Sequence, residues 1–507
     1  MPDLPSEPSV TQLRHQARDL QRAVRSGVQE ALAEVGERHP AGRPDDTAAV
    51  SFALSAAQLV VARRYGYPSW ARLRRYVEVL ERYSRFPARM AQDAPTDPVA
   101  PADDFLRLAC LRYEDDQPER WAQARRILEE YPEITQVSIH AAAAAADVPR
   151  LAASLAADPR AANRPGGPYR WEPLFYLAYA RHDPAIEHAA VLRAARLLLQ
   201  AGADPNAGYL WHGLPTPFTV LTGIFGEGEL GPVRQPRHPH AQTLARLLLE
   251  AGADPNDGQA LYNRMFEPDN DHLELLLEFG LGTGDGGPWK ARMGDALDTP
   301  EQLVRGDLRW AITHGMTERV RLFVAHGVDI VSPFGDGDTP AERAATTGHP
   351  ELARYLVDHG AAEPDLRPGQ KFVAAALVAD HATIAELRAA HPGLAEAVRR
   401  RSPSLTVWAA AQGRPGSVEL LAGLGFDVNA KGRSDAPAKD PWETALHVAA
   451  MEGNLGLAQS LLSLGADPDI RDERFNSTPL GWAWHFGQEQ LIELLEPFTT
   501  PEDETDG

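Results

Sequence analysis

The sequence predicts an all-α solenoid of about eleven degenerate helix-turn-helix units, preceded by a small helical domain. The first observation behind this prediction is that ARLLLQAGADPN at 195–206 recurs, with one substitution, as ARLLLEAGADPN at 245–256. The second is that glycine returns at fixed offsets through much of the chain. Self-similarity with a period of roughly 20 to 50 residues is typical of proteins in which small units stack on one another.

Each unit is expected to hold two helices, each of which ends at a glycine. In three copies a threonine precedes a glycine by nine residues, and these pairs are Thr339 with Gly348, Thr444 with Gly453, and Thr478 with Gly487. A second glycine follows twelve residues later, at Gly360 and Gly465. Because threonine favours the N-cap and glycine accepts the left-handed conformation that ends a helix, the pattern predicts a helix, a tight turn, a second helix and a loop finger.

The offset of 50 residues between the two near-identical stretches exceeds this period. Measured against the glycine spacing, the surplus lies between the two helices of one unit, in GEGELGPVRQPRHPH at 226–240. A shorter insert at 182–190 falls at the same point of the preceding unit. We expect the two inserts to lie on one edge of the stack and to distinguish this array. A later connection is expected to end in a helix that begins near Thr299.

The unit resembles the ankyrin repeat, whose signature is T-P-L-H-x-A. TALH at 444–447, TPL at 478–480 and SIHAAA at 138–143 carry the likeness best. The resemblance implies a repeat of about 33 residues. It also implies a concave face, made of loop fingers and the exposed ends of first helices, at which such arrays bind protein partners.

The repeat pattern divides the chain into four segments. We expect an N-terminal helical domain at 1–86, a linker at 87–101, the repeat array at 102–499 and an acidic disordered tail at 500–507. Three amphipathic helices are predicted in the first segment from their apolar periodicity. This segment resembles the small helical domain that precedes ankyrin arrays in many bacterial proteins.

Composition and charge restrict the class of partner. The chain has 71 acidic and 50 basic residues and a formal net charge of -21. This charge repels phosphate and anionic lipid, so we expect neither nucleic acid nor membrane binding, and a protein partner with a basic surface. The single cysteine, Cys110, allows no intramolecular disulfide. With no signal-peptide pattern and no long apolar run, a cytoplasmic location is expected.

Several short motifs suggest chemistry but lack the context that the chemistry needs. GEGELG and GTGDGG match a dinucleotide-binding pattern, yet neither lies between a strand and a helix, so both are interpreted as flexible loops. His238 and His240 could contact a metal, but without a third ligand they are interpreted as solvated loop histidines. FGDGDTP at 334–340 lacks the length and terminal glutamate of a calcium loop and is interpreted as a finger. We therefore predict no metal, no cofactor and no enzyme.

Two alternatives stay open at this point. One is an enzyme or regulator with its activity in the N-terminal helical domain or in the inserted loops at 182–190 and 226–240. The other is nucleic-acid contact by a basic run in the first segment, although such runs usually form a solvated helix face. The residues of this run are Arg63, Arg64, Arg72, Arg74 and Arg75.

The candidate partner-binding residues are large apolar side chains at positions expected to be exposed on the concave face. They are Phe334, Trp442 and Phe475 in fingers, and Met451 and Phe486 on first helices. The alternative is that each of them packs onto its neighbouring finger. The finger at 429–444 is about seven residues longer than its neighbours and is the best candidate recognition loop. Three tryptophans at an inward-facing helix position are predicted to lie in the core, and they are Trp310, Trp408 and Trp482.

Overall fold

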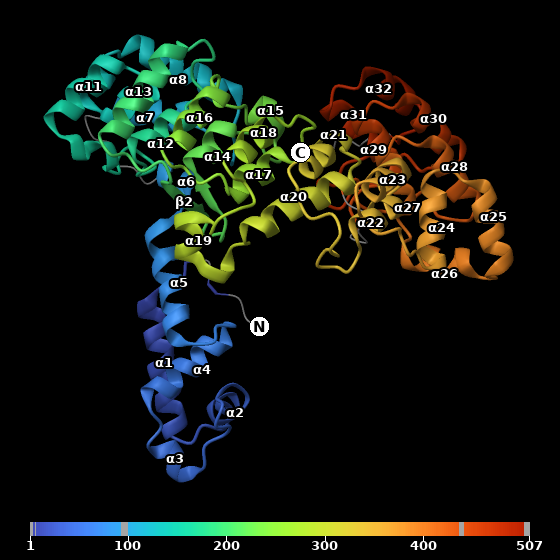
Figure 1. The fold of residues 1–507 in the computed structure, drawn as a ribbon, viewed down its shortest axis with the longest axis horizontal. Coiled ribbons are helices and arrows are strands. Elements are labelled where there is room, and N and C mark those ends of the chain that lie inside the picture. Colours follow the sequence, from blue (N-terminus) through green and yellow to red (C-terminus); the bar gives the residue numbers. More distant parts are fainter. Residues whose placement is uncertain (1–3, 6, 93–99, 436–440, 501–507) are drawn as a thin grey trace. The chain divides into compact units, whose positions relative to one another are not determined.

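The computed structural model describes residues 4–5, 7–92, 100–435 and 441–500. The chain divides into two compact units, Met1–Asp307 (unit 1) and Leu308–Gly507 (unit 2). Both consist mainly of short paired helices, as the ribbon in Figure 1 shows. The predicted all-α class is confirmed, with one small sheet in unit 1. Parts of the predicted tail (501–507), of the predicted linker (93–99) and of the long finger (436–440) lie outside the described residues.

Unit 1 begins with a helical region. Its helices are α1 (Val10–Arg25), α2 (Gln29–Arg38), α3 (Asp46–Val50), α4 (Leu54–Arg64), α5 (Trp70–Tyr83) and α6 (Pro87–Gln92). Gly27, with φ of 72°, ends α1 and separates it from α2. Asp45 caps α3 and Ser69 caps α5.

Five helix pairs follow in unit 1. They are α7 (Ala100–Ala109) with α8 (Pro118–Glu130), α10 (Ile139–Ala144) with α11 (Val148–Ala157), α12 (Pro173–Tyr179) with α13 (His188–Gln200), α14 (Val220–Phe225) with α16 (Ala241–Glu250), and α17 (Gly258–Arg264) with α18 (Asp271–Glu278). Short additional helices are α9 (Ile134–Val137), α15 (Gly231–Arg234) and α19 (Gly287–Met293), with 3-10 turns at Pro159–Asn163 and Gly294–Ala296. Helix α20 (Pro300–Thr313) begins one residue after Thr299, as predicted, and extends across the unit boundary.

Unit 2 continues the same pattern. Its helices are α21 (Thr317–Ala325), α22 (Pro340–Thr346) with α23 (Pro350–Asp358), α24 (Pro368–Leu377) with α25 (His381–Ala390), α26 (Leu394–Arg401), α27 (Leu405–Ala411) with α28 (Pro415–Gly423), α29 (Ala445–Met451) with α30 (Leu455–Ser463), and α31 (Pro479–His485) with α32 (Glu489–Leu495). Trp408 and Trp482 are buried in its core, as predicted. Trp310, in α20, is half-buried.

The glycine spacing has a conformational cause. The glycines that end helices have φ between 63° and 104° in unit 2, and they are Gly315, Gly327, Gly348, Gly360, Gly413, Gly425, Gly453, Gly465 and Gly487. Gly202 and Gly252 of unit 1 behave alike, with φ of 90° and 95°. Residues with a Cβ rarely adopt this left-handed conformation, which explains why glycine recurs there.

A three-stranded sheet lies in unit 1 and was not predicted. It consists of β1 (Ser84–Arg85), β2 (Gly208–Trp211) and β3 (Pro217–Thr219), in the order β1-β2-β3. Strand β1 pairs with β2 in parallel, and β2 pairs with β3 in the antiparallel sense. Beside the sheet, Leu80, Leu210, Trp289 and Met293 form one buried apolar cluster. The end of α5 is thereby joined to the finger that precedes α14.

Candidate functional site

The five predicted partner-binding residues differ in exposure. Phe475 and Phe486 are 69% and 47% exposed. Trp442 and Met451 are half-buried. Phe334 is buried, so the expectation that it is exposed is wrong. In its finger the Phe334 amide donates to the Asp338 carbonyl (2.9 Å), and this tight turn folds the finger back on itself.

Four rings of unit 2 lie side by side and form what we call the aromatic patch: Trp442, Phe475, Trp482 and Phe486. Ring centroids are 6.3 Å apart for Trp442 and Phe475, and 6.1 Å apart for Trp482 and Phe486. The Arg474 guanidinium lies 3.8 Å from the centroid of the Trp442 ring. This distance allows a cation–π interaction, which holds a charged group at the edge of an apolar surface.

Asp472 shapes the finger that carries Phe475. Its carboxylate accepts hydrogen bonds from the backbone amides of Phe475 (2.7 Å) and Ser477 (3.0 Å) and from the indole nitrogen of Trp482 (3.1 Å). Although burial opposes its charge, the hydrogen bonds from these amides hold the pKa of Asp472 below its ordinary value. The exposed ring of Phe475 is therefore presented by a rigid turn.

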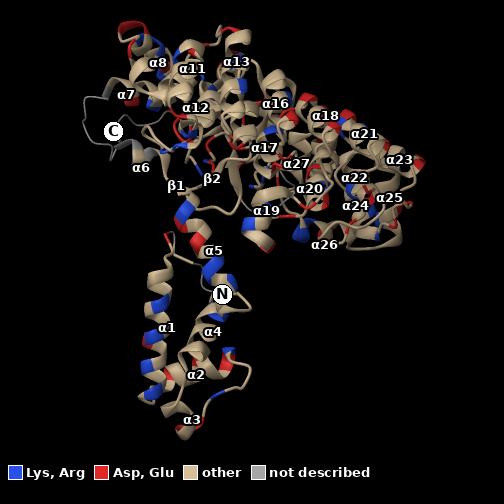
Figure 2. Ribbon diagram, turned by 60° about the vertical axis from the view of Figure 1, so that its left-hand side comes forward, with Lys and Arg blue, Asp and Glu red and all other residues tan. Residues whose placement is uncertain are grey.

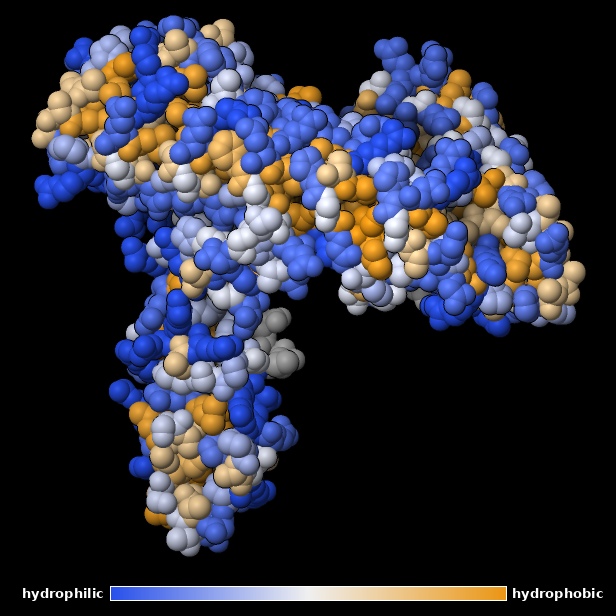
Figure 3. All heavy atoms as spheres, in the orientation of Figure 1, coloured by the Kyte–Doolittle hydropathy of each residue, from blue (hydrophilic) through white to orange (hydrophobic). Residues whose placement is uncertain are grey.

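Sequence reasoning missed one member of this surface, Arg474, which adds a cation beside the rings. Over the face shown in Figure 3, hydrophobic residues stand among hydrophilic ones in each unit, so single exposed apolar residues carry little information. The proximity of two exposed rings, Phe475 and Phe486, to the same buried ring, Trp482, is what marks this surface.

His447, from the TALH motif, joins two neighbouring fingers. Its Nδ1 accepts the Thr444 amide hydrogen (3.2 Å), and its Nε2 donates to the Ser477 carbonyl (3.0 Å). This arrangement fixes the neutral tautomer with hydrogen on Nε2. Burial lowers the pKa of His447 to about 4.

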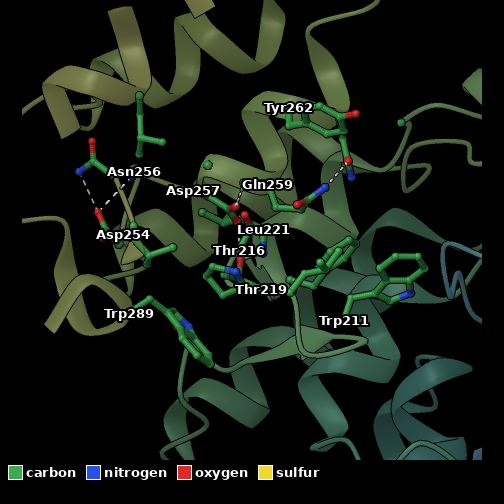
Figure 4. Close-up of a pocket in the computed structure, with 18 of the residues that line it drawn as sticks. Trp211, Thr216, Thr219, Leu221, Asp254, Asn256, Asp257, Gln259, Tyr262 and Trp289 are labelled. Atoms are coloured by element: carbon green, nitrogen blue, oxygen red, sulfur yellow. Dashed lines mark hydrogen bonds between the residues drawn. The ribbon is translucent and has the colours of Figure 1, made fainter. Parts of the chain in front are cut away.

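A cavity of about 650 Å³ opens in unit 1. Its walls come from the α7–α8 loop, the β2–β3 finger, the insert at 226–240, the start of α17 and helix α19 (Figure 4). Five aromatic residues line it: Tyr113, Trp211, Phe218, Tyr262 and Trp289. The sequence analysis named only the insert at 226–240 as a possible place of activity, and it did not predict this aromatic lining, because the five residues are scattered over almost 180 positions of the chain.

Asp257 lies in the wall of this cavity and is fully buried. Its carboxylate accepts from the Thr219 and Thr222 hydroxyls and from the backbone amides of Gln259 (3.1 Å) and Ala260 (2.9 Å). Burial raises the pKa of Asp257 above its ordinary value. The side chain caps α17 and links it to the start of α14, so its role is structural.

The insert at 226–240 is packed into unit 1, in contrast to the flexible loop that was predicted. Glu227 is 2% exposed and pairs with Arg237 (2.7 Å) and Arg264. Both arginines also pair with Asp269 and Asp271. Asp269 precedes α18, and Asp271 is its first residue. The insert is thereby fixed to the following repeat. Asp269, Asp271 and His272 could form a metal site by their spacing, but the two aspartates already neutralise these guanidinium groups.

The two histidines of the insert are also packed, and the expectation that they are solvated is wrong for His238. Its side chain is 3% exposed, and burial lowers its pKa far below the ordinary value, so it stays neutral. His240 is half-buried and its Nε2 donates to the Ile186 carbonyl (2.6 Å). His188 bonds through Nε2 to Thr243 (2.9 Å). The inserts at 182–190 and 226–240 therefore contact each other, as their place in the repeat predicted.

The basic run of the first segment has partners within the chain. Arg63 donates to the Arg38 carbonyl and Arg75 to the Ala291 carbonyl. The other three pair with carboxylates, in the pairs Arg64 with Glu34, Arg72 with Asp295 and Arg74 with Glu78. Basic and acidic residues alternate along α5 in Figure 2. Each arginine of the run thus has a partner within the chain.

Comparison with known proteins supports the repeat interpretation. Residues 308–369 and 446–496 match the family described as ankyrin repeats (many copies). Protein phosphatase 1 regulatory subunit 27 of Mus musculus is 38% identical over 66 residues, which are 13% of this chain and 43% of that protein. L-asparaginase of Dirofilaria immitis is 28% identical over 187 residues, which are 36% of this chain and 30% of that protein. The chain thus spans less than half the length of these curated relatives.

Residues 308–369 and 446–496 of the chain are ankyrin repeats. Ankyrin repeats indicate a role in protein–protein interaction, and one relative is named as a regulatory subunit. Among the described residues, none of the helices combines the length and the apolar character needed to cross a bilayer.

Proposed function

We propose that this protein is a cytoplasmic interaction scaffold that binds a protein partner on the concave face of its repeat array, at the aromatic patch. The observation that carries the proposal is that Phe475 and Phe486 are exposed beside Trp442 and Trp482. Clustered rings of this kind are the usual anchors of protein interfaces. Phe334 is no longer part of the proposed surface, while Met451 remains at its edge.

The chemistry of the partner follows from charge. A net charge of -21 favours a partner with a basic surface. Such charge complementarity raises the association rate more than the final affinity. Added salt weakens this electrostatic attraction. The partner is therefore expected to present an apolar segment with basic neighbours.

The proposal assigns no catalysis to the chain. Asp257, the most buried carboxylate of the cavity in unit 1, is occupied by four protein donors. Among the described lining residues there is neither histidine nor arginine. Burial also raises the pKa of the Cys110 thiol to about 12, which leaves no reactive thiolate. These groups therefore do not support the alternative in which the chain is an enzyme.

The test is a quantitative pull-down with the full chain and the double variant Phe475→Ala, Phe486→Ala. Both rings are exposed, so the variant should fold, which circular dichroism would check. We expect partners that bind the patch to be lost by at least tenfold, because interface anchors contribute about 2 kcal/mol or more. Tyr131→Ala, an exposed ring in unit 1, is the matched control and should change nothing. Retention of every specific partner by the double variant would refute the proposed surface.

A further inference from the structure

The cavity of unit 1 has an acidic lining that the interaction surface in unit 2 does not explain. Five carboxylate side chains line it, and they are Glu114, Glu229, Asp254, Asp257 and Asp298. The single lysine of the lining, Lys290, donates its ammonium hydrogen to the Leu297 carbonyl. Carboxylates in a cavity with low-dielectric walls concentrate cations there. The expected occupant is therefore positively charged.

Two buried polar atoms of the lining lack hydrogen-bond partners. The Glu114 side chain is 14% exposed, and its Oε1 accepts from His212 Nε2 (2.6 Å) while Oε2 has no donor. Asn263 is 2% exposed, and its Oδ1 accepts from Gln259 (2.8 Å). Its Nδ2 lies beside the Tyr113 hydroxyl but has no acceptor at strict hydrogen-bonding geometry. An unsatisfied buried polar atom costs free energy, which a ligand can recover. The cavity thus offers one acceptor and one donor.

The aromatic lining restricts the shape of the cation. Trp211 donates its indole hydrogen to the Arg112 carbonyl (3.1 Å), and Tyr262 donates its hydroxyl hydrogen to Glu229 (2.6 Å), so both rings are held in place. In Figure 4 the rings of Trp211 and Trp289 flank the polar group around Asp257 and Gln259. Planar guanidinium groups stack on such rings and pair with carboxylates better than ammonium groups do.

The backbone around the cavity is held in an uncommon conformation. Tyr113, His212 and Glu227 have φ of 61°, 50° and 59°, although none of them is glycine. Tyr113 lines the cavity, His212 pairs with Glu114, and Glu227 adjoins the lining residue Gly228. Strained residues of this kind collect at binding sites, where they fix the side chains before the ligand arrives.

We propose that this cavity binds a guanidinium group, carried by an arginine side chain of a peptide segment. The guanidinium would donate to Glu114 Oε2 and lie against the aromatic lining, and the carbonyl of the same residue would accept from Asn263 Nδ2. A volume of about 650 Å³ holds a side chain with its adjoining backbone, and ligand cavities usually span about 300 to 1,000 Å³. Free arginine carries the same guanidinium, so the experiment must distinguish the two sources.

The test is isothermal titration calorimetry of the full chain with N-acetyl-arginine-N-methylamide. The citrulline analogue has the same shape without the charge and should bind at least tenfold more weakly. The lysine analogue should also bind more weakly, and added salt should weaken the arginine probe. Free arginine, whose own carboxylate would face an acidic lining, should bind worse than the capped probe. If free arginine binds more tightly, the source is a small molecule and the peptide assignment is overturned.

Variants of the lining complete the test. Glu114→Gln and Asp298→Asn should each weaken binding of the capped arginine threefold to tenfold. Asp358→Asn, an exposed aspartate of unit 2, is the matched control and should change affinity less than twofold. The double variant of the aromatic patch should bind the probe normally, so failure of this proposal is distinguishable from failure of the proposed scaffold. Equal binding of the arginine and citrulline probes, or no binding of either, would overturn the guanidinium assignment.

Discussion

Replacement of Arg264 by methionine should release the insert at 226–240 from the following repeat. The Arg264 side chain is 0% exposed and pairs with Glu227, Asp269 and Asp271. Methionine keeps much of the apolar stem of arginine but removes the charge. The perturbation therefore leaves a buried carboxylate, Glu227, without one of its two cations.

The free-energy cost of Arg264→Met depends on the ion pairs that the variant leaves in place. Removing one partner of a buried ion pair costs about 3 to 5 kcal/mol. Here Arg237 still pairs with Glu227 (2.7 Å), and the two aspartates are 38% and 40% exposed, so solvent compensates them. The cost should lie near the lower limit, about 3 kcal/mol, which corresponds to roughly a hundredfold increase in local opening.

Hydrogen exchange of the full chain measures this opening. Two amides of the insert report it, because Glu227 donates to the Gln235 carbonyl (2.6 Å) and His238 donates to the Ile224 carbonyl (2.9 Å). The control is Arg246→Met, which breaks the surface ion pair between Arg246 and Glu278. These two side chains are 44% and 54% exposed, so the control variant should leave exchange unchanged. If both variants exchange alike over 226–240, the ion pairs do not fix the insert.

Two further predictions concern stability. Burial lowers the pKa of His447 to about 4, below the value near 6.5 of an unfolded histidine, so the unfolded chain binds the proton more readily. Its stabilisation, at most about 3 kcal/mol, should be complete above pH 6.5 and be lost as the pH falls to 4. The hydrogen-exchange protection factors over 444–486 should therefore fall with pH in the wild type but not in His447→Gln. Gly223→Ala places a Cβ 2.0 Å from the Tyr179 ring and should destabilise unit 1 by about 1 to 3 kcal/mol in thermal melts. Gly306→Ala, whose Cβ would meet nothing within 4 Å, should slightly stabilise the chain, and similar melts for both variants would contradict the packing argument.

The repeat was predictable from sequence because its signals are local. Thr339 caps α22 and accepts from the Glu342 amide, and Gly348 and Gly360 have φ of 94° and 104°. Each of these conformations depends on a few neighbouring residues, so residue type and spacing suffice to predict them. The same locality predicted the burial of Trp408 and Trp482.

The inserts and the cavity depend on distant residues, and local patterns could not reveal them. The glycines and prolines of 226–240 are typical of a flexible loop, yet Glu227 is buried because Arg264, many residues later, neutralises it. Tyr113 and Trp289 meet at one cavity only after the fingers between them have stacked. For Phe334, residue type predicted an exposed anchor, whereas the turn closed at Asp338 buries it.

The short strand β1 affects how the array could be isolated for experiments. Ser84 and Arg85 pair with Leu210 and Trp211, and the Arg85 carbonyl accepts from the His212 amide (2.9 Å). A shortened chain that began at residue 102 would leave the outer edge of β2 without this partner. Bare strand edges recruit strands from other molecules, so such a fragment should self-associate. An isolated array should therefore keep Ser84 and Arg85, which cover this edge of β2.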